Sequence, residues 1–316
     1  MHRGIVFFLI VLTGSIAIAA DRDPPKPDKH ASAAEDPALT GPATLAPDPA
    51  GAQEEIRFGI SPYLSKEVLT EAFEPIMVYL SEKTGRRFRL VIPESYSAML
   101  SLVADGAVDF AYLPPASYVK ARLRDRSLRL LLTDVLHGVD FYSGYIVVLE
   151  TADIDSLQDL RGKTMAFVDR ESTSGYLMPM RHLVSRGIQP ARFFGEIIFT
   201  GEHDESLRRL AAHEVDAIAI SSGILSHFRR RGADLRNVRI LSKTGVVPHD
   251  AVCATRHVPT LLAEEVQEIL LGLNSRTAAG RAVLPEVPQL NGWRVGDPSE
   301  YDVVEDLIRR GEAAVR

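Results

Sequence analysis

The spacing of hydrophobic residues switches repeatedly between two periods from Ile56 onwards. Residues 56–60 alternate between hydrophobic and polar, which predicts a strand, whereas the hydrophobic residues of 68–80 recur at helical spacing. Pro75 lies inside that helical stretch and predicts a kink or a restart of the helix. Residues 108–113 are almost continuously hydrophobic, as in a strand of a sheet covered on both faces. Strands that alternate with helices in this way predict an α/β fold with parallel-rich sheets.

The pattern falls into two successive series, and the second begins at Tyr142. Further strands are expected at 88–92, 128–132, 145–149, 164–168, 196–199, 215–220, 238–241 and 250–255, and helices at 95–104, after Pro115, at 175–186, at 205–213, up to Arg231, from Pro259 and from Ser299. Two series predict two lobes, one formed by residues 56–141 and 248–316 and the other by residues 142–247. The chain then crosses between the lobes twice, which predicts a two-strand hinge beside a ligand cleft.

Residues 1–55 differ in character from the rest of the chain. Arg3 precedes a hydrophobic run at 5–12 and small residues ending in Ala19, a pattern that predicts a cleaved signal peptide over residues 1–20. An uncleaved N-terminal membrane anchor is the alternative. Residues 21–55 are rich in proline and alanine and predict a disordered tether. We therefore expect an exported, periplasmic protein that contacts the membrane at most through its N-terminus.

Composition and charge exclude several classes of protein. The chain of 316 residues is 46% hydrophobic and 25% charged, as in an ordinary globular protein. Its net charge of −6 and its lack of a basic block argue against nucleic-acid binding. The single cysteine, Cys253, excludes an intramolecular disulfide and a cysteine-based metal site. We expect Cys253 to be a buried, unreactive residue of the returning strand, and we expect neither a metal nor a cofactor.

The segment from Asp169 to Gly175 is the sharpest candidate for a binding site. It lies between a predicted strand and a predicted helix, and Ser172, Thr173 and Ser174 supply three hydroxyl groups. Together with the first N–H groups of the helix and its positive dipole end, these hydroxyls can hold an anion. Plain capping of the helix by one serine is the alternative explanation.

Other candidates stand at similar positions in the pattern. His203 follows a predicted strand and can donate a hydrogen bond to an anion, or it can be a capping or surface residue. Asp250 lies at the returning crossing and can accept from a ligand, or it can stabilise a turn. Three tyrosines can line a cleft or pack in the interior: Tyr96, Tyr142 and Tyr145.

Several enzyme motifs are absent or incomplete. Gly162-Lys163-Thr164 has Leu157 where a phosphate-binding loop opens with glycine, and there is no G-x-S-x-G nucleophile motif. His213-Glu214 lacks the second histidine of a zinc protease, because Ala217 stands in its place. We therefore expect no enzymatic activity, with a serine hydrolase that uses Ser172 or Ser174 as the alternative.

Over residues 56–290 the chain resembles the periplasmic phosphonate, phosphite and phosphate-binding proteins of ABC transporters. The following segments carry the resemblance: Phe58-Gly59-Ile60-Ser61-Pro62, Glu94-Ser95-Tyr96, Gly106-Ala107-Val108-Asp109-Phe110-Ala111-Tyr112, Asp159-Leu160-Arg161-Gly162-Lys163, Ser172-Thr173-Ser174-Gly175, Gly201-Glu202-His203-Asp204, Val215-Asp216-Ala217 and Val247-Pro248-His249-Asp250. Each segment alone is weak evidence for the family, but their order and spacing together are specific to it. The resemblance implies a two-lobed periplasmic binding protein of the type II kind that closes on a small phosphorus oxyanion.

The resemblance also implies which residues bind the ligand. The implied ligand residues are Tyr96, Tyr142, Ser172, Thr173, Ser174, His203 and Asp250. Ser172 to Ser174 and the helix N-terminus are implied to hold the phosphoryl oxygens, with Tyr96 and His203 donating from the opposing side. This implication favours the anion-binding interpretation of residues 172–174 over plain capping.

The sequence departs from the family pattern at one ligand-binding position, and this departure affects which ligand we expect. Members that bind an aminoalkyl phosphonate pair its ammonium with two acids, and Asp250 matches one of them. The other falls near Gly223, where the sequence has no acid. Because a buried ammonium that lacks an acid partner costs about 2–5 kcal/mol, we expect weak binding of 2-aminoethylphosphonate. Phosphite, methylphosphonate or phosphate is expected instead, with Asp250 accepting from a protonated ligand oxygen.

The sequence therefore predicts a monomeric binding protein that captures a small phosphorus oxyanion and delivers it to an ABC permease and its ATPase. A sensory module that presents its ligand to a membrane receptor is the alternative among binding proteins. A different small anion, such as a sulfonate or a carboxylate, is the alternative among ligands.

Overall fold

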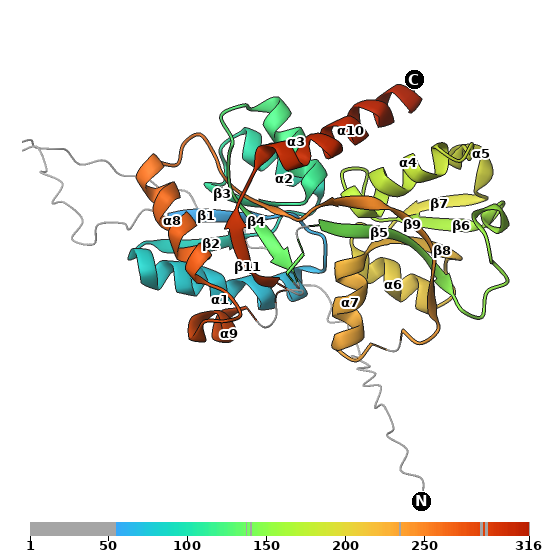
Figure 1. The fold of residues 1–316 in the computed structure, drawn as a ribbon, viewed down its shortest axis with the longest axis horizontal. Coiled ribbons are helices and arrows are strands. Elements are labelled where there is room, and N and C mark those ends of the chain that lie inside the picture. Colours follow the sequence, from blue (N-terminus) through green and yellow to red (C-terminus); the bar gives the residue numbers. More distant parts are fainter. Residues whose placement is uncertain are drawn as a thin grey trace, which may run out of the picture. The chain divides into compact units, whose positions relative to one another are not determined.

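The computed structural model describes residues 55–136, 138–139, 141–233, 235–284, 287 and 290–315, without the side chains of 310–315. The predicted signal peptide and almost all of the predicted tether lie outside the described residues. Two β-sheets organise the described part of the chain (Figure 1). In the part that the structure describes, no helix combines the length and the hydrophobicity that a membrane span requires.

The first sheet has six strands among the described residues, in the order β11-β4-β10-β3-β1-β2. Its strands are β1 (Glu55–Ile60), β2 (Arg87–Val91), β3 (Phe110–Leu113), β4 (Arg129–Leu136), β10 (Ala251–Ala254) and β11 (Leu290–Val295). Its helical neighbours are α1 (Lys66–Thr84), α2 (Tyr96–Ala104), α3 (Pro115–Arg124), α8 (Thr260–Gly272), α9 (Ala278–Val283), η3 (Pro298–Tyr301) and α10 (Asp302–Val315). Strands β10 and β11 join this sheet although they come late in the chain.

The second sheet has five strands among the described residues, in the order β7-β6-β8-β5-β9. Its strands are β5 (Phe141–Leu149), β6 (Thr164–Phe167), β7 (Glu196–Phe199), β8 (Ala217–Ser221) and β9 (Val238–Pro248). Its helical neighbours are η1 (Leu157–Leu160), η2 (Thr173–Leu177), α4 (Met178–Val184), α5 (Pro190–Phe193), α6 (His203–Ala211) and α7 (Ser222–Arg230). The predicted α/β class is confirmed, and the lobe bounds given above stay a prediction.

Both sheets are mixed rather than parallel-rich, which corrects the expectation from the pattern. β1 pairs in parallel with β2 and β3, and β6 pairs in parallel with β7 and β8. The strands next to the crossings, β4 and β10 in one sheet and β5 and β9 in the other, pair antiparallel. The reason is topological: a strand–helix–strand unit places its two strands in parallel, whereas a chain that leaves a sheet and returns to it adds antiparallel strands.

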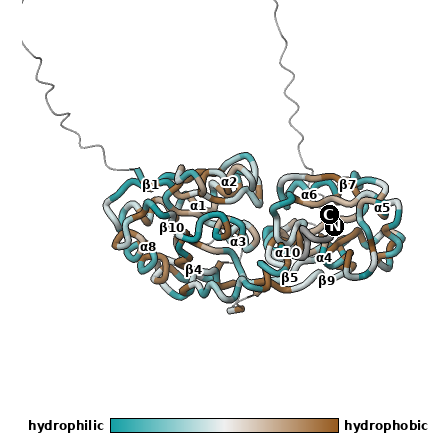
Figure 2. The backbone as a smooth tube through the Cα atoms, turned by 90° about the horizontal axis from the view of Figure 1, so that it is seen from above, coloured by the Kyte–Doolittle hydropathy of each residue, from teal (hydrophilic) through white to brown (hydrophobic). Residues whose placement is uncertain are grey.

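Alternating residues of the inner strands pack against helices on opposite faces of each sheet. Ile218 and Ile220 of β8 belong to the same buried cluster as Leu207 of α6, while Ala217 and Ala219 pack with Leu183 of α4. The period of two follows from the pleat of a strand, which points successive side chains to opposite faces. Hydrophobic stretches accordingly run through the helices and strands of both groups of elements (Figure 2).

Some of the observed helices and strands differ in length from those expected from the sequence. The helix at 68–80 is one continuous helix, α1, which contains Pro75, so the predicted restart does not occur. The buried neighbours Phe73 and Ile76 hold the helix together across the missing N–H group. Strand β9 extends to Pro248, well beyond the predicted end at residue 241, because it pairs with β5 over the full length of β5. Strand β11 has no expected counterpart.

The chain crosses between the two sheets at two adjacent places. It leaves β4 at Leu136 for β5 and returns from β9 at Pro248 to β10. The crossings are held side by side because β5 pairs antiparallel with β9, with Phe141 opposite Pro248. The backbone N–H of Asp134 donates to the carbonyl oxygen of Asp250 at 3.1 Å, which joins the two crossing segments a second time.

Cys253 lies in β10 and is fully buried, as expected. Burial also raises the pKa of its thiol. We therefore predict that a thiol reagent labels Cys253 slowly in the native protein and at once after unfolding in guanidinium chloride, because only the exposed thiolate reacts. Labelling of the native protein at the rate of the unfolded one would contradict this packing.

Candidate functional site

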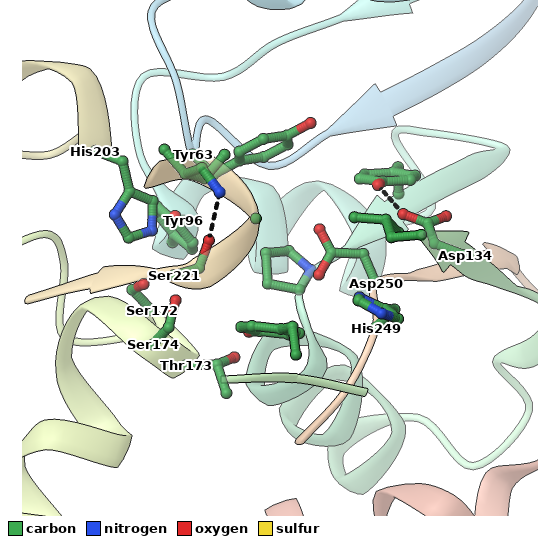
Figure 3. A pocket seen from close by; sticks show the side chains of 16 residues that line it. Tyr63, Tyr96, Asp134, Ser172, Thr173, Ser174, His203, Ser221, His249 and Asp250 are labelled. Carbon is green, nitrogen blue, oxygen red and sulfur yellow. Dashed lines mark hydrogen bonds between the residues drawn. The ribbon is translucent and has the colours of Figure 1, made fainter. Parts of the chain in front are cut away.

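A cavity of about 70 Å³ opens where the carboxyl ends of strands from both sheets converge. The residues after β1, β3, β6 and β7 and at the end of β8 all contribute to its wall, and ligand sites of open α/β sheets lie at this end of the strands. Because a single water needs about 10–15 Å³, the cavity has room for a small polar ligand. Its wall consists of Tyr63, Tyr96, Tyr112, Pro114, Asp134, Leu136, Tyr142, Ser172, Thr173, Ser174, His203, Ser221, Gly223, Ile224, His249 and Asp250 (Figure 3).

The loop after β6 brings three hydroxyl groups to the cavity. Ser172, Thr173 and Ser174 are each at most 3% exposed; Ser172 precedes the short helical turn η2, and Thr173 and Ser174 are its first two residues. The Ser172 hydroxyl caps this turn by accepting from the N–H of Gly175 at 3.1 Å. The first N–H groups of such a turn have no acceptor inside it, so they add donors on the side of the hydroxyls. Capping and anion binding are therefore compatible here.

Helix α3, which follows strand β3 of the first sheet, holds this loop in place. The N–H of Ala116 donates to Thr173 Oγ1 at 2.9 Å, and Lys120 forms an ion pair with Glu171. Because Thr173 Oγ1 accepts from α3, its own proton can be donated to an acceptor in the cavity. Thr173 thus connects elements of both sheets to the ligand space.

Tyr96 and His203 are buried donors that border the cavity. Tyr96 opens α2 and His203 opens α6, and the exposed fractions of their side chains are 1% and 3%. Burial lowers the pKa of His203 to about 4, so its imidazole is neutral at pH 7 and has one N–H donor. Burial raises the pKa of Tyr96 well above its usual value, so its hydroxyl stays protonated. Among the described residues, neither Tyr96 Oη nor His203 Nδ1 has a partner at hydrogen-bond geometry, although Ser172 lies close enough to Tyr96 to offset part of the rise in its pKa.

His203 does not oppose the hydroxyl loop, which corrects the expectation from the resemblance. Strand β7, which precedes His203, is the parallel neighbour of β6, which precedes Ser172. The N–H groups of Thr200 and Gly201 donate to the carbonyl oxygens of Phe167 and Val168, so the two loops lie along the same edge of one sheet. Tyr96 comes from α2 in the first group of elements and lines the same cavity, so its donation to a ligand from the opposing side stays a prediction.

The returning crossing supplies the aromatic and acidic side of the cavity. Tyr142 stacks on His249 with ring centroids 5.5 Å apart, and Tyr301 donates to the carbonyl oxygen of His249 at 2.8 Å. Asp250 follows and points into the cavity (Figure 3). Burial raises the pKa of Asp250 to about 7. Its carboxyl group is therefore partly protonated at neutral pH.

The cavity wall contains all of the ligand residues that the resemblance implied. Tyr145 is not among the lining residues. Sequence reasoning missed Tyr63, Tyr112, Asp134, Ser221 and His249. Ser221 ends β8, His249 follows β9, and Tyr112 and Asp134 lie near the ends of β3 and β4. Polar residues close to strand ends were the available signal. Gly223 lines the wall without an acid, as expected, but Asp134 brings a second carboxyl group from another strand.

Among the described residues, neither a lysine nor an arginine lines the cavity, and no hydrogen-bonded serine–histidine–aspartate arrangement is present there. The Ser172 hydroxyl is engaged by Gly175. Among the described residues no hydrogen bond joins His203 to Ser172 or to Asp250. The described residues also contain no cluster of three or more histidine, cysteine or acidic side chains arranged for a metal ion.

The fold and this cavity define a class of protein, the periplasmic-type binding proteins that take a small ligand between strand ends. The family model for the phosphonate periplasmic substrate-binding proteins of ABC transporters matches residues 58–301. The chain belongs to this family.

Two curated relatives align with this chain over only part of their own length. A phosphate-import protein of Mycolicibacterium smegmatis is 28% identical over 176 residues, which cover 53% of this chain and 55% of that protein. A tetrathionate sensor histidine kinase of Salmonella typhimurium is 23% identical over 248 residues, which cover 75% of this chain and 40% of the kinase. The chain thus spans about half the length of these relatives, or less.

Solved structures share the fold. A binding-protein component of an ABC phosphonate transporter from Pseudomonas aeruginosa superposes with a TM-score of 0.76 at 20% identity, covering 84% of this chain and 89% of that one. A protein of Prochlorococcus marinus, solved in complex with methylphosphonate, gives a TM-score of 0.74 at 18% identity, covering 82% of this chain and 98% of that one.

The turn after Ser172 requires glycine at position 175. A Cβ atom on Gly175 would lie 2.6 Å from Val168 Cβ and 2.7 Å from Ser172 Oγ. We predict that Gly175→Ala lowers the free energy of unfolding by about 1–3 kcal/mol, the usual cost of overpacking. Denaturant unfolding measures it. Gly272→Ala is the matched control, because nothing lies within 4 Å of its added Cβ. Equal stability of both variants would refute the close packing of this turn.

Proposed function

We propose that this protein captures a small phosphorus oxyanion, namely phosphite, methylphosphonate or phosphate, and delivers it to an ABC permease and its ATPase without chemical conversion. One observation carries the proposal: Tyr96 Oη and His203 Nδ1 are buried and lack partners among the described residues, and both residues line a cavity whose wall also carries the hydroxyl groups of Ser172, Thr173 and Ser174. Buried polar atoms without partners are rare in folded proteins, and an oxyanion supplies the missing ones.

Binding would rest on neutral donors. Ser172, Thr173, Ser174 and Tyr96 offer hydroxyl protons, His203 offers one N–H, and the first N–H groups of η2 add their dipoles. Hydrogen bonds to an ionised acceptor are about twice as strong as neutral ones, and the low dielectric of a closed cavity strengthens them further. Closure of the proposed lobes 56–141 with 248–316 and 142–247 would exclude water from the ligand.

Asp250 would select the protonation state of the ligand. A carboxylate beside an anion is repulsive unless a proton lies between them. Asp250 therefore accepts from a P–O–H group, which favours an incompletely ionised phosphorus oxyanion over a fully ionised one.

The setting of the protein is also proposed. Residues 1–20 would direct export to the periplasm, residues 21–55 would form a tether, and the protein would act as a monomer. A sensory role is the second candidate, because the chain is similar to part of a tetrathionate sensor histidine kinase. Genes for a permease and an ATPase beside this one support transport, whereas a neighbouring receptor gene supports sensing.

Calorimetric titration of the purified, ligand-free chain tests the proposed ligand class. We predict one-to-one binding of phosphite, phosphate or methylphosphonate. Ser174→Ala and His203→Ala should each weaken it about 10–100-fold, since a hydrogen bond to a charged group contributes about 1.5–3 kcal/mol. Ser101→Ala, at an exposed site on α2 outside the cavity, should leave the affinity unchanged. Failure of all three ligands to bind would contradict the proposal.

We further predict that 2-aminoethylphosphonate binds at least tenfold more weakly than the best of those ligands. Gly223 offers no carboxylate for an ammonium group, and the Asp134 carboxyl group already accepts a hydrogen bond from Tyr112. Competition in the same titration measures the ratio. A higher affinity for 2-aminoethylphosphonate than for phosphite would overturn this ligand preference.

A further inference from the structure

The cavity has an acidic end that the proposed function uses only in part. Asp134 lies near the end of β4, before the first crossing, and Asp250 lies on the returning crossing. The N–H of Asp134 donates to the carbonyl oxygen of Asp250 at 3.1 Å, so the two residues are adjacent across the crossings. Both side chains border the cavity (Figure 3).

Asp134 is buried and only half satisfied. It is 3% exposed, and the Tyr112 hydroxyl donates to its Oδ2 atom. Its Oδ1 atom has no hydrogen-bond partner among the described residues. The indole of Trp293 lies close enough to lower the pKa of Asp134, but its Nε1 atom is also without a partner at hydrogen-bond geometry among those residues. A buried, unsatisfied carboxyl oxygen at a cavity wall points to an interaction with a ligand.

The surroundings of Asp134 favour its neutral form. Around the acidic end lie Tyr63, Tyr112, Tyr142, Tyr301, His249, Trp293 and Asp250, while Tyr96 and His203 line the cavity nearer the hydroxyl loop (Figure 3). Among the described residues that line the cavity there is no lysine or arginine, so none of them supplies a fixed positive charge to compensate two carboxylates. Burial, followed by the charge of Asp250, raises the pKa of Asp134 well above its usual value. Burial also raises the pKa values of Tyr63 and Tyr112, so these hydroxyls remain neutral.

We propose that Asp134 is a specificity-determining residue that faces the cavity as a neutral carboxylic acid and donates a hydrogen bond through its Oδ1–H to the bound phosphorus oxyanion. The proton comes from water and remains on Asp134 Oδ1, while Tyr112 donates to Oδ2. Asp250 then remains the single acceptor for the P–O–H group of the ligand. The acidic end thus offers one donor and one acceptor, which matches a singly protonated oxyanion. The inference rests on the proposed function for the identity of the ligand.

Asp134→Asn tests the protonation state directly. The asparagine amide reproduces a neutral acid, with an oxygen to accept from Tyr112 and an N–H₂ group to donate into the cavity. We expect methylphosphonate to bind Asp134→Asn within about threefold of the wild type at pH 7. As the pH rises to 9, the affinity of the wild type for methylphosphonate should fall faster than that of Asp134→Asn, because only the wild type can ionise at this position. A tenfold or greater loss at pH 7 would mean that the wild type needs the carboxylate, which overturns the proposal.

A measurement without ligand keeps this test separate from the proposed function. A carboxyl group whose pKa is raised in the folded state stabilises the protein fully below its unfolded pKa and loses that contribution as the pH rises through the folded pKa. The melting temperature of Asp134→Asn, relative to that of the wild type, should therefore increase as the pH rises from 5 to 9. A constant difference would show an ionised Asp134 and overturn the inference, whether or not phosphorus ligands bind.

Two further variants complete the design. Asp153→Asn removes an exposed acid outside the cavity. Its affinity for methylphosphonate and its melting temperature should change with pH as those of the wild type do between pH 6 and 9. Tyr112→Phe removes the donor to Asp134 Oδ2, so the carboxyl group should stay neutral to higher pH. The affinity of this variant for methylphosphonate should therefore begin to fall at a higher pH than that of the wild type. An earlier loss of affinity in Tyr112→Phe would contradict the inference. So would a selective loss of 2-aminoethylphosphonate binding in Asp134→Asn, because an ammonium partner requires a carboxylate.

Discussion

The antiparallel pairing of β5 with β9 is the constraint on which the rest of the site depends. It places Phe141 opposite Pro248 and thereby holds the outgoing and returning crossings side by side. Asp134 precedes the first crossing, Tyr142 follows it, and Asp250 lies on the second. The β5–β9 ladder, together with the backbone bond from Asp134 to Asp250, brings these three residues to one cavity wall. The same two crossings are the covalent connections between the sheets among the described residues, so any relative motion of the sheets bends them.

No lysine or arginine stands among the described residues that line the cavity, so the proposed binding of an anion must rely on preorganised dipoles. Hydroxyl and N–H dipoles are weaker than a full positive charge, so they have to be fixed in place before the ligand arrives. The structure fixes them by using one side of each group for folding. Ser172 caps η2, Thr173 accepts from α3, and the backbone N–H of His203 donates to the carbonyl oxygen of Tyr63 at 3.1 Å. The remaining hydrogen-bonding capacity of each side chain is left for a ligand.

Incomplete satisfaction of buried groups connects stability to binding. Tyr96 Oη, His203 Nδ1 and Asp134 Oδ1 lack partners in the described part of the chain, and an unmade buried hydrogen bond costs about 1–3 kcal/mol. A ligand that satisfies these atoms recovers that cost, so binding stabilises the folded protein. The neutral state of His203 also matters, because a neutral imidazole keeps its single proton on one nitrogen and avoids burying a charge.

The sequence by itself determined the α/β class, the order of most strands and helices, and the hydroxyl loop at 172–174, because each depends on local periodicity or on a contiguous motif. His203 and Asp250 were also found, since each belongs to a short segment that resembles a family. Only the tertiary structure decided that β10 lies between β3 and β4, that β11 forms the edge beside β4, that both sheets are mixed, and that His203 lies beside the hydroxyl loop. It alone brought Asp134 and Tyr112 to the cavity. These features depend on pairing between strands far apart in the chain, and local periodicity carries no information about which distant strand a segment will join.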